Sequence, residues 1–346
     1  MTEDIHSLVP LIVKAVSGEA LTADEAKAGF DRMMAGQASP VRIGALLTAM
    51  QTKGLAPSEI AGGVRALQAA MVPVSAEAEM LVDTCGTGGG SVTTFNISTA
   101  AALVAAGGGI RVAKHGNRSF TSKCGSADVL EALGVRIELS PEGMSRVLEE
   151  VGIVFMYAPL LHPAMRHVGP VRRELGLTTI MNLLGPLTNP AGARRQVVGV
   201  ADPSVLDLVV EGLAELGHDR AMVVHGEPGM DELSPCGVTR VAELVDGDIQ
   251  HYEVTPESLG LRRVEAGDLA GGAPEENAEI LRAILEGRKK GAVRTAVSLN
   301  AAAAFYVAGQ ASSLRDGVEA AGAAIDSGAA LAALEGLIEA SCRYPA

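Results

Sequence analysis

The sequence predicts an α/β protein with a small all-helical domain and a larger domain whose central, mostly parallel sheet is surrounded by helices. Three observations support this prediction. The first 71 residues carry helix signals and no strand pattern. Beyond Pro73, short apolar runs alternate with helical patterns, as in repeated β–α units. Apolar residues make up 48% of the chain and aromatic ones only 3%, so Ala, Val, Leu and Met must fill the core.

Helix signals come in three groups near the N-terminus. Thr22 and Glu25 have the spacing of a capping box, which predicts a helix that runs to about residue 36. A Ser-Pro pair at 39–40 predicts the start of a second helix, and residues 57–71 are expected to form a third.

Strand-like runs begin after this helical region. We expect strands at residues 80–83, 110–113, 135–137, 153–157, 196–200 and 221–224. An Asp-Gly turn at 245–249 predicts a hairpin, and the chain from about residue 275 to its end is expected to be helical. Residues 162–184 show no convincing strand and are expected to return to the helical domain.

The predicted domain division follows from these runs. The helical domain comprises residues 1–72 and is completed by about 162–185, whereas residues 73–161 and 186–346 form the α/β domain. The formal net charge of -13 disfavours nucleic acid as a partner, because an acidic surface repels a polyanion. No apolar run reaches about 18 residues, so we expect no membrane span. Four cysteines without C-x-x-C spacing indicate free thiols of a reducing cytoplasm.

A glycine cluster at 86–90 lies between the run at 80–83 and a helix expected from about Ser98. Such a loop lets backbone N–H groups close on phosphate oxygens, and a helix N-terminus behind it favours negative charge. An ordinary flexible connection explains the cluster equally well when it is taken alone. The cluster lacks the Gly-Lys-Ser/Thr of a P-loop and the G-x-G-x-x-G spacing of a dinucleotide site.

A second constellation, K-H-G-N-R-S at 114–119, combines cations and polar side chains around one glycine. This composition suits a phosphate group, although an exposed basic turn is the alternative. Both loops are expected to follow strands of one parallel sheet, so they should emerge at the same edge, where ligands bind.

Two adjacent carboxylates, Asp231 and Glu232, follow the run at 221–224. Carboxylates at a strand end can hold Mg²⁺ that bridges to substrate phosphates, whereas a polar surface turn is the simpler interpretation of this pair alone. The stretch N-L-L-G-P-L-T-N-P at 182–190 is interpreted as a structured crossover, and its composition indicates no chemical role.

These segments together resemble the anthranilate phosphoribosyltransferase family of tryptophan biosynthesis. The shared motifs are G-T-G-G (86–89), N-I-S-T (96–99), K-H-G-N-R-S (114–119), H-P-A-M (162–165) with the V-x-x-V-R that follows, N-L-L-G-P-L-T-N-P (182–190) and D-E (231–232). They occur in the family's order, and the resemblance covers essentially the whole chain. It implies transfer of the 5-phosphoribosyl group from phosphoribosyl pyrophosphate to the amine of anthranilate, with release of pyrophosphate. It also implies Mg²⁺ as the cofactor and a homodimer formed through the helical domain.

The resemblance also implies which residues form the site. Residues expected to bind the donor are Gly86, Gly89, Gly90, Thr94, Asn96, Ile97, Ser98, Thr99, Lys114, His115, Gly116, Asn117, Arg118, Ser119, Phe120, Thr121, Ser122 and Ser126. The implied anthranilate contacts are Gly86, Asn117 and Arg172, and the implied metal ligands are Ser98, Asp231 and Glu232. His115 and His162 are expected near the path of the acceptor.

The expected chemistry needs no strong base. An aryl amine is neutral at physiological pH, so the protein must supply positioning and charge stabilisation. No residue is identified as an acid or base, and Lys114 and Arg172 are expected to act through charge and position.

One position departs from the family pattern. Gly90 stands where the family commonly has Asp, so donor affinity or its magnesium dependence is expected to differ. Three other functions stay open from the sequence, and one of them is an enzyme of the same fold with a different aromatic acceptor. A pyrimidine-nucleoside phosphorylase of related fold is disfavoured by the signature around Arg172. A non-enzymatic paralogue that binds nucleic acid is disfavoured by the net charge of -13 and by the intact motifs.

Overall fold

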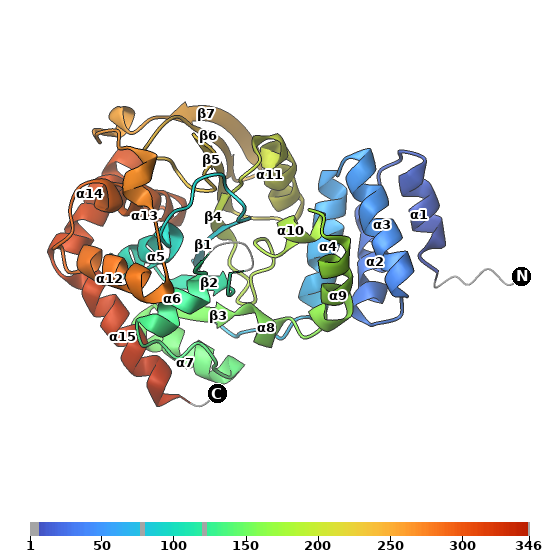
Figure 1. Ribbon diagram of the computed structural model, residues 1–346, viewed down its shortest axis with the longest axis horizontal. Coiled ribbons are helices and arrows are strands. Elements are labelled where there is room, and N and C mark those ends of the chain that lie inside the picture. The colour runs from blue at the N-terminus through green and yellow to red at the C-terminus, as the bar shows by residue number, and fades with distance from the viewer. Residues whose placement is uncertain (1–6, 77–79, 120–122, 345–346) are drawn as a thin grey trace, which may run out of the picture.

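A helical bundle lies beside a seven-stranded sheet that carries helices on both faces (Figure 1). This computed structural model describes residues 7–76, 80–119 and 123–344. The prediction of a small helical domain and a larger α/β domain with a mostly parallel sheet is confirmed.

Four helices form the N-terminal part of the bundle: α1 Val9–Val16, α2 Ala23–Met34, α3 Pro40–Lys53 and α4 Pro57–Ala70. The capping box predicted at the start of α2 is present. The Glu25 N–H donates to Thr22 Oγ1 at 3.2 Å, and the Thr22 N–H donates to Glu25 Oε2 at 2.8 Å. The three predicted helices are confirmed, and α1 is an additional one.

Two later helices pack onto this bundle. They are α9 Met165–Leu175, which contacts α2 and α3, and α10 Met181–Leu184, which contacts α4. Val168 and Leu184 join Phe30 of α2 in one buried cluster. Helices α9 and α10 thus lie against the N-terminal helices. The link α8 Ala158–Leu161 connects this region to the sheet.

The sheet has the strand order β3-β2-β1-β4-β5-β6-β7. The strands are β1 Val82–Gly86, β2 Val112–Gly116, β3 Ile153–Tyr157, β4 Arg195–Gly199, β5 Arg220–Gly226, β6 Thr239–Val245 and β7 Asp248–Val254. The first five run parallel, and β6 and β7 form the predicted hairpin. Asp246 and Gly247 at its turn have φ of 51° and 94°, which the Asp-Gly pair accommodates.

The remaining helices cover the two faces of the sheet. They are α5 Ile97–Gly107, α6 Ser126–Ala132, α7 Pro141–Val151, α11 Leu206–Glu215, α12 Pro274–Leu285, α13 Ala292–Ala308, α14 Leu314–Asp326 and α15 Ala329–Arg343, with short 3-10 turns at Pro203–Val205, Glu257–Leu259 and Ala266–Leu269. Helices α5 and α13 lie against one face, while α11 lies on the other and also contacts α4 of the bundle. The bundle and the α11 face therefore share one apolar core.

The predicted strand at 135–137 is wrong. These residues connect α6 to α7 without strand pairing, although Val135 and Ile137 are only 3% and 2% exposed. The Arg136 N–H between them donates to Ser341 Oγ at 3.0 Å, so a side chain of α15 takes the place of a neighbouring strand. The apolar alternation reflects burial beneath a helix.

Strands β1 and β2 begin and end two to three residues later than predicted. Pairing of β1 with β4 continues to Gly86↔Gly199, and pairing of β2 with β3 continues to Gly116↔Tyr157. Polar residues that the sequence placed in loops therefore lie within the ends of the strands.

No single described helix is long and apolar enough to cross a membrane. Only α14 and α15 taken together have sufficient length and apolar character, and they meet at a bend of 65°.

Candidate active site

Three polar segments meet at the carboxyl edge of the parallel strands. The glycine loop at 86–91 begins at the last residue of β1, residues 117–119 follow β2, and residues 227–232 follow β5. Because β1, β2 and β5 run parallel, their carboxyl ends lie at the same edge, as the sequence predicted.

The glycine loop after β1 is bound to the loop after β5. The Gly88 N–H donates to Asp231 Oδ2 at 2.8 Å, and the Ser91 N–H donates to the Gly229 carbonyl at 2.9 Å. A Cβ atom at Gly86 would overlap the Asp231 carboxylate, so only glycine permits this approach. The two loops thus form one assembly.

Gly90, the departure from the family pattern, lies at the same contact. A Cβ atom at this position would be 2.8 Å from the Gly229 carbonyl oxygen and 3.6 Å from Asp231 Oδ1. An Asp side chain at position 90 would displace the loop after β5 and would place a second negative charge beside Asp231. The glycine therefore allows a closer contact between the loops.

Asp231 and Glu232 form a pair of carboxylates with the properties of a cation site. Burial raises the pKa of Asp231, partly opposed by the N–H of Gly88, and burial together with the charge of Asp231 raises the pKa of Glu232 well above its usual value. Among the described residues neither forms an ion pair with Lys or Arg. A divalent cation would supply the missing positive charge, so this donor set fits Mg²⁺.

The described residues contain no cluster of three or more His, Cys, Asp or Glu side chains placed to hold a metal on its own.

Lys114 extends from the end of β2 toward the start of α5. It is 3% exposed, and its Nζ donates to the Thr84 carbonyl at 2.6 Å and to Ser98 Oγ at 3.4 Å. Burial lowers the pKa of Lys114, and the charge of Asp83 opposes that shift. The structure thus brings together Lys114 and Ser98, two residues expected in the donor site.

The segment after β2 is held by α6. Arg118 Nη1 pairs with Asp128 Oδ1 at 2.9 Å and Glu131 Oε2 at 2.5 Å, and its guanidinium lies 5.7 Å from the Tyr157 ring centroid. The Ser119 N–H donates to Asp128 Oδ2 at 3.2 Å. These carboxylates therefore hold the guanidinium of Arg118, and a bound phosphate would have to compete with them for it.

Further expected donor residues lie around this segment. Ser126 Oγ donates to the Asn117 carbonyl at 3.3 Å, which ties α6 to the end of β2. Gly116 ends β2, and Gly89 lies in the exposed part of the glycine loop. Phe120, Thr121 and Ser122 lie outside the described residues.

Asn96 caps the start of α5 without a side-chain bond to that helix. Its Oδ1 instead accepts Asn277 Nδ2 at 2.9 Å, and its Nδ2 donates to the Cys124 carbonyl at 3.1 Å. Thr94 precedes Asn96 and is half-buried. The side chain of Asn96 is thereby fixed between α12 and the loop before α6.

Two residues of the N-I-S-T motif have buried side chains. Ile97 is 0% exposed and belongs to the core, and Thr99 is 1% exposed with its Oγ1 unpaired among the described residues. The side chain of Thr99 lines a void of about 10 Å³ with Lys114. Any donor contact from Ile97 or Thr99 therefore falls to the backbone N–H groups at the start of α5.

His115 and His162 lie together at the other side of β2. Their Nε2 atoms are 3.2 Å apart, and their ring centroids are 5.0 Å apart. Burial lowers the pKa of His115 to about 3 and that of His162 to about 4, so both rings are neutral at pH 7. A neutral pair of this kind can border an aromatic amine group, which is itself uncharged at this pH.

Arg172 lies in the last turn of α9, on the bundle side of the molecule. It is half-buried, burial lowers its pKa, and none of the described residues pairs with its guanidinium. Its charge is therefore available to an anionic ligand. No hydrogen bond joins it to the described part of the donor loops.

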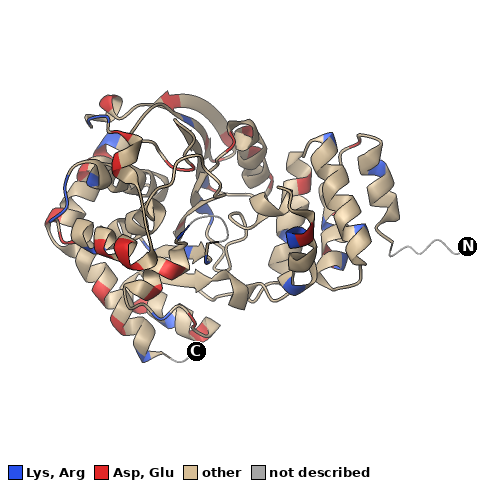
Figure 2. Cartoon of the chain, in the orientation of Figure 1, with Lys and Arg blue, Asp and Glu red and all other residues tan. Residues whose placement is uncertain are grey.

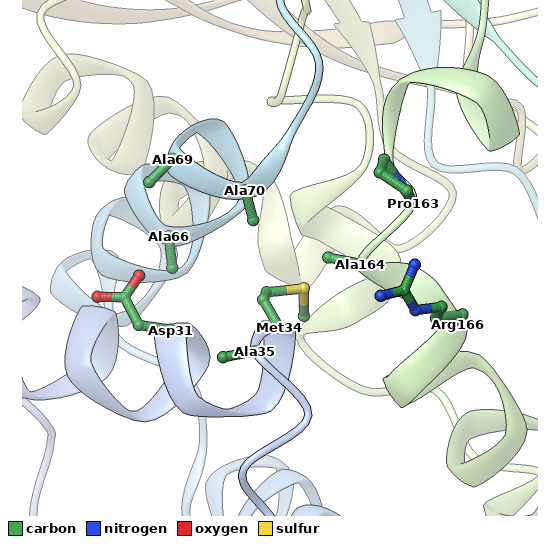
Figure 3. A pocket seen from close by; sticks show the side chains of 9 residues that line it. All are labelled: Asp31, Met34, Ala35, Ala66, Ala69, Ala70, Pro163, Ala164 and Arg166. Carbon is green, nitrogen blue, oxygen red and sulfur yellow. The ribbon is translucent and has the colours of Figure 1, made fainter.

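A separate hollow of about 360 Å³ lies between α2, α4 and the start of α9 (Figure 3). Its lining combines small apolar side chains with two charged ones, Arg166 and Asp31, and Asp31 also pairs with Lys27 at 2.8 Å. With one cation beside one carboxylate, this lining does not suit a polyphosphate. Acidic residues are widely spread over the outer helices, for example on α12 (Figure 2), so the donor loops must bind an anion against the overall field.

Several residues at the site were missed from the sequence. Asp128 holds the segment after β2, and the G-S-A-D spacing at the start of α6 signals such a cap. Asn277 is 1% exposed and fixes Asn96, but nothing in its neighbourhood in the sequence indicates this contact.

The comparisons with known proteins agree with this geometry. A helical bundle domain of a glycosyl transferase family matches residues 9–71, and the a/b domain of the same family matches residues 78–331. Fold and site therefore define an enzyme of the glycosyl transferase class.

Individual relatives narrow this class. The anthranilate phosphoribosyltransferase of Rubrobacter xylanophilus is 53% identical over 330 residues, which are 95% of this chain and 96% of the relative. The crystal structure of the Thermus thermophilus enzyme of that name matches with a TM-score of 0.92 at 47% identity, covering 96% of this chain and 99% of that one. The Saccharomyces cerevisiae enzyme in complex with phosphoribosyl pyrophosphate and Mg matches with a TM-score of 0.89 at 26% identity over 98% and 99% of the two chains. The chain belongs to the anthranilate phosphoribosyltransferase family.

Proposed function

We propose that this enzyme transfers the 5-phosphoribosyl group of phosphoribosyl pyrophosphate to the amine of anthranilate, releasing pyrophosphate, as a step of tryptophan biosynthesis. The observation that carries the proposal is the meeting of three segments at one sheet edge: a glycine loop, a basic segment and a carboxylate pair. That combination supplies backbone donors, positive charge and a cation site to one polyphosphorylated ligand.

On the donor side, the proposed contacts come from two strand ends and the start of α5. The backbone N–H groups of Gly86, Gly89 and Gly90 would hold phosphate oxygens. Lys114 and Arg118 would supply positive charge. To do so, Arg118 would exchange its ion pairs with Asp128 and Glu131 for contacts to the ligand. The remaining proposed donor contacts are Thr94, Asn96, Ile97, Ser98, Thr99, His115, Gly116, Asn117, Ser119 and Ser126.

Asp231, Glu232 and the Ser98 hydroxyl are proposed to hold Mg²⁺. The ion would supply positive charge to the departing pyrophosphate. The raised pKa values of the two carboxylates are consistent with this role, because a bound cation stabilises their ionised forms.

On the acceptor side, Gly86, Asn117 and Arg172 are the proposed anthranilate contacts. The unpaired guanidinium of Arg172 would bind the carboxylate of anthranilate and so orient its amine. The neutral rings of His115 and His162 would border the path of the acceptor. Because the attacking amine is already neutral, positioning and charge account for the chemistry without a strong base.

The test is an assay of anthranilate fluorescence with phosphoribosyl pyrophosphate, with and without Mg²⁺. We expect loss of anthranilate that depends on Mg²⁺ and equals the pyrophosphate released. Phosphorolysis of thymidine or uridine without anthranilate turnover would instead identify a nucleoside phosphorylase. Absence of both activities, with donor binding retained in calorimetry, would mean that anthranilate is not the acceptor.

We further propose that the enzyme is a homodimer formed through the helical domain. Val9, Val13 and Val16 are 45%, 61% and 72% exposed and recur at spacings of four and three residues on α1. Val41 on the neighbouring α3 is 80% exposed, and a face of this kind is a candidate interface. Analytical ultracentrifugation should give a dimer for the wild type and a monomer for Val13→Glu; a monomeric wild type would contradict the proposal.

The domain division and the compartment are also proposals. Residues 1–72 with about 162–185 would form the helical domain, and 73–161 with 186–346 the α/β domain, as the packing of α9 and α10 on the bundle supports. The four cysteine thiols form no disulfide in the described part of the chain, which supports a reducing cytoplasm as the place of action.

A further inference from the structure

Strands β1 and β2 share a much shorter ladder than their neighbours. β1 pairs with β4 from Val82↔Arg195 to Gly86↔Gly199, and β2 pairs with β3 along its whole length, but β1 and β2 pair only at Val82↔Val112. Backbone pairing between them is therefore lost toward the carboxyl edge, where both donor loops begin.

The direction of the N–H and C=O groups shows which of them would have paired if the ladder between β1 and β2 continued. The N–H of Val82 donates to the Arg111 carbonyl at 2.9 Å, so Val82 faces β2. Successive residues of a strand turn their N–H and C=O groups to opposite neighbours, so Thr84 is the next residue of β1 to face β2. A continued ladder would pair Thr84 with Ala113 and His115.

Side chains bond three of these four backbone groups instead. The bonds are Asn189 Nδ2 to the Ala113 carbonyl at 2.8 Å, Lys114 Nζ to the Thr84 carbonyl at 2.6 Å, and the His115 N–H to Asp83 Oδ1 at 3.3 Å. Buried backbone groups left without partners are costly, so these bonds make the separation of the strands stable. The split is part of the folded structure.

Asn189 and Asp83 are joined to each other inside this split. Asn189 Nδ2 donates to Asp83 Oδ2 at 2.7 Å, while Asn189 Oδ1 accepts the N–H of Ala191 at 2.9 Å. Asp83 is 0% exposed and Asn189 is 3% exposed. Burial raises the pKa of Asp83 to about 6, opposed by the charge of Lys114 and by the bond from Asn189. The crossover at 182–190, which had no chemical role from composition, is thus anchored between the two strands.

We propose that Asp83 and Asn189 are positioning residues of the donor site, which hold the ends of β1 and β2 apart and so fix the spacing between the glycine loop at 86–91 and the segment at 114–119. This inference rests on the proposed function, because the spacing matters only if both loops hold one donor. The split also directs Lys114. In a continued ladder the Thr84 carbonyl would accept the His115 N–H, and Lys114 would lose the partner that places its Nζ near Ser98.

The test compares Asn189→Ala with Thr188→Val. Thr188 is 0% exposed, and its Oγ1 donates to the Leu184 carbonyl at 2.8 Å, so Thr188→Val removes a buried bond from the same crossover without touching β1 or β2. For both variants and the wild type we would measure the donor Kd by calorimetry with Mg²⁺, both KM values and the Tm. Asn189→Ala should raise the donor Kd and KM by about tenfold or more, with the anthranilate KM unchanged.

Hydrogen exchange gives a second readout that does not depend on turnover. In the free enzyme, exchange at residues 112–116 should be faster in Asn189→Ala and unchanged in Thr188→Val, because only the first removes a bond that holds the end of β2 in place. If Asn189→Ala does not fold, Asn189→Ser, which keeps one hydroxyl donor, takes its place in the same comparison.

The outcomes separate the two proposals. Loss of donor affinity in Asn189→Ala but not in Thr188→Val supports the positioning role. Equal donor affinity in the two variants, at equal loss of Tm, would overturn it while leaving the proposed function intact. A wild type that does not bind phosphoribosyl pyrophosphate with Mg²⁺ would overturn the proposed function itself.

Discussion

Replacing the buried Glu59 with Ala should destabilise the helical bundle more than the removal of any surface charge. Glu59 is 0% exposed in the first turn of α4, and Lys53, whose side chain is 5% exposed, pairs with it at 2.8 Å. The backbone N–H groups of Leu21 and Ala56 each donate to its carboxylate at 3.0 Å. One side chain therefore joins three segments: the turn before α2, the end of α3 and the start of α4.

The expected magnitude follows from what Glu59→Ala leaves behind. Breaking a buried ion pair from one side costs about 3–5 kcal/mol, because Lys53 stays buried without a partner. The two orphaned N–H groups are part of the same loss, so we expect a total of about 4 kcal/mol. Glu59→Gln keeps an amide oxygen for one N–H and should cost about half as much. Asp31→Ala is the control: it breaks the half-exposed pair of Lys27 and Asp31, which is worth roughly 0.3–0.5 kcal/mol.

The assay must follow the bundle itself, since a chain with two cores does not guarantee one unfolding transition. Urea denaturation would be monitored by hydrogen exchange of peptides from α4, which gives the free energy of opening locally. A loss below about 1 kcal/mol for Glu59→Ala, comparable with Asp31→Ala, would refute the reasoning from burial.

Three further predictions concern the site. Arg172→Ala should raise the KM for anthranilate at least about tenfold more than the KM for the donor, and equal effects in steady-state kinetics would contradict its role. Asp231→Asn removes charge from the cation site, so calorimetry should show donor affinity lowered about tenfold or more and less dependent on Mg²⁺; unchanged Mg²⁺ dependence would argue against this ligand. The pKa of Asp83 is raised from 3.8 to about 6, so the folded protein binds this proton more tightly than the unfolded chain and the associated stability is lost as pH rises through this range. Asp83→Asn should remove this slope, worth roughly 3 kcal/mol, from unfolding free energies measured between pH 4 and 6, and a slope equal to that of the wild type would contradict the assignment.

Local signals in the sequence predicted the helices well, because their causes are local. The capping box at Thr22 and Glu25 and the Asp-Gly turn at 246–247 act over a few residues and are present as expected. The failure at 135–137 has the opposite cause. Burial of those residues beneath α15 depends on a helix more than 190 residues later, as the bond from Arg136 to Ser341 shows. The placement of β4 beside β1 is likewise a property of the assembled sheet.

The residues of the site also fall into two groups, those that local motifs indicated and those that depend on distant segments. Sequence motifs indicated the three loops, since each is a short run of glycines, cations or carboxylates after an apolar strand. They did not indicate Asn277 or the role of Asn189, which act through single bonds to segments far along the chain. They gave Asp83 no role of its own, because a polar residue within a buried strand gives no sign of its partners.

The helical bundle is assembled from parts of the chain that are made at different times. Helices α1 to α4 end at Ala70, whereas α9, which supplies Val168 to their common core, begins at Met165. At roughly 5–20 residues per second, the ribosome needs about 5–20 s to synthesise the intervening segment. During that time the faces of α2, α3 and α4 that α9 and α10 cover in the folded protein have no partner in the nascent chain. Chaperones that bind exposed apolar helices should therefore meet this protein early in its synthesis, before its sheet exists.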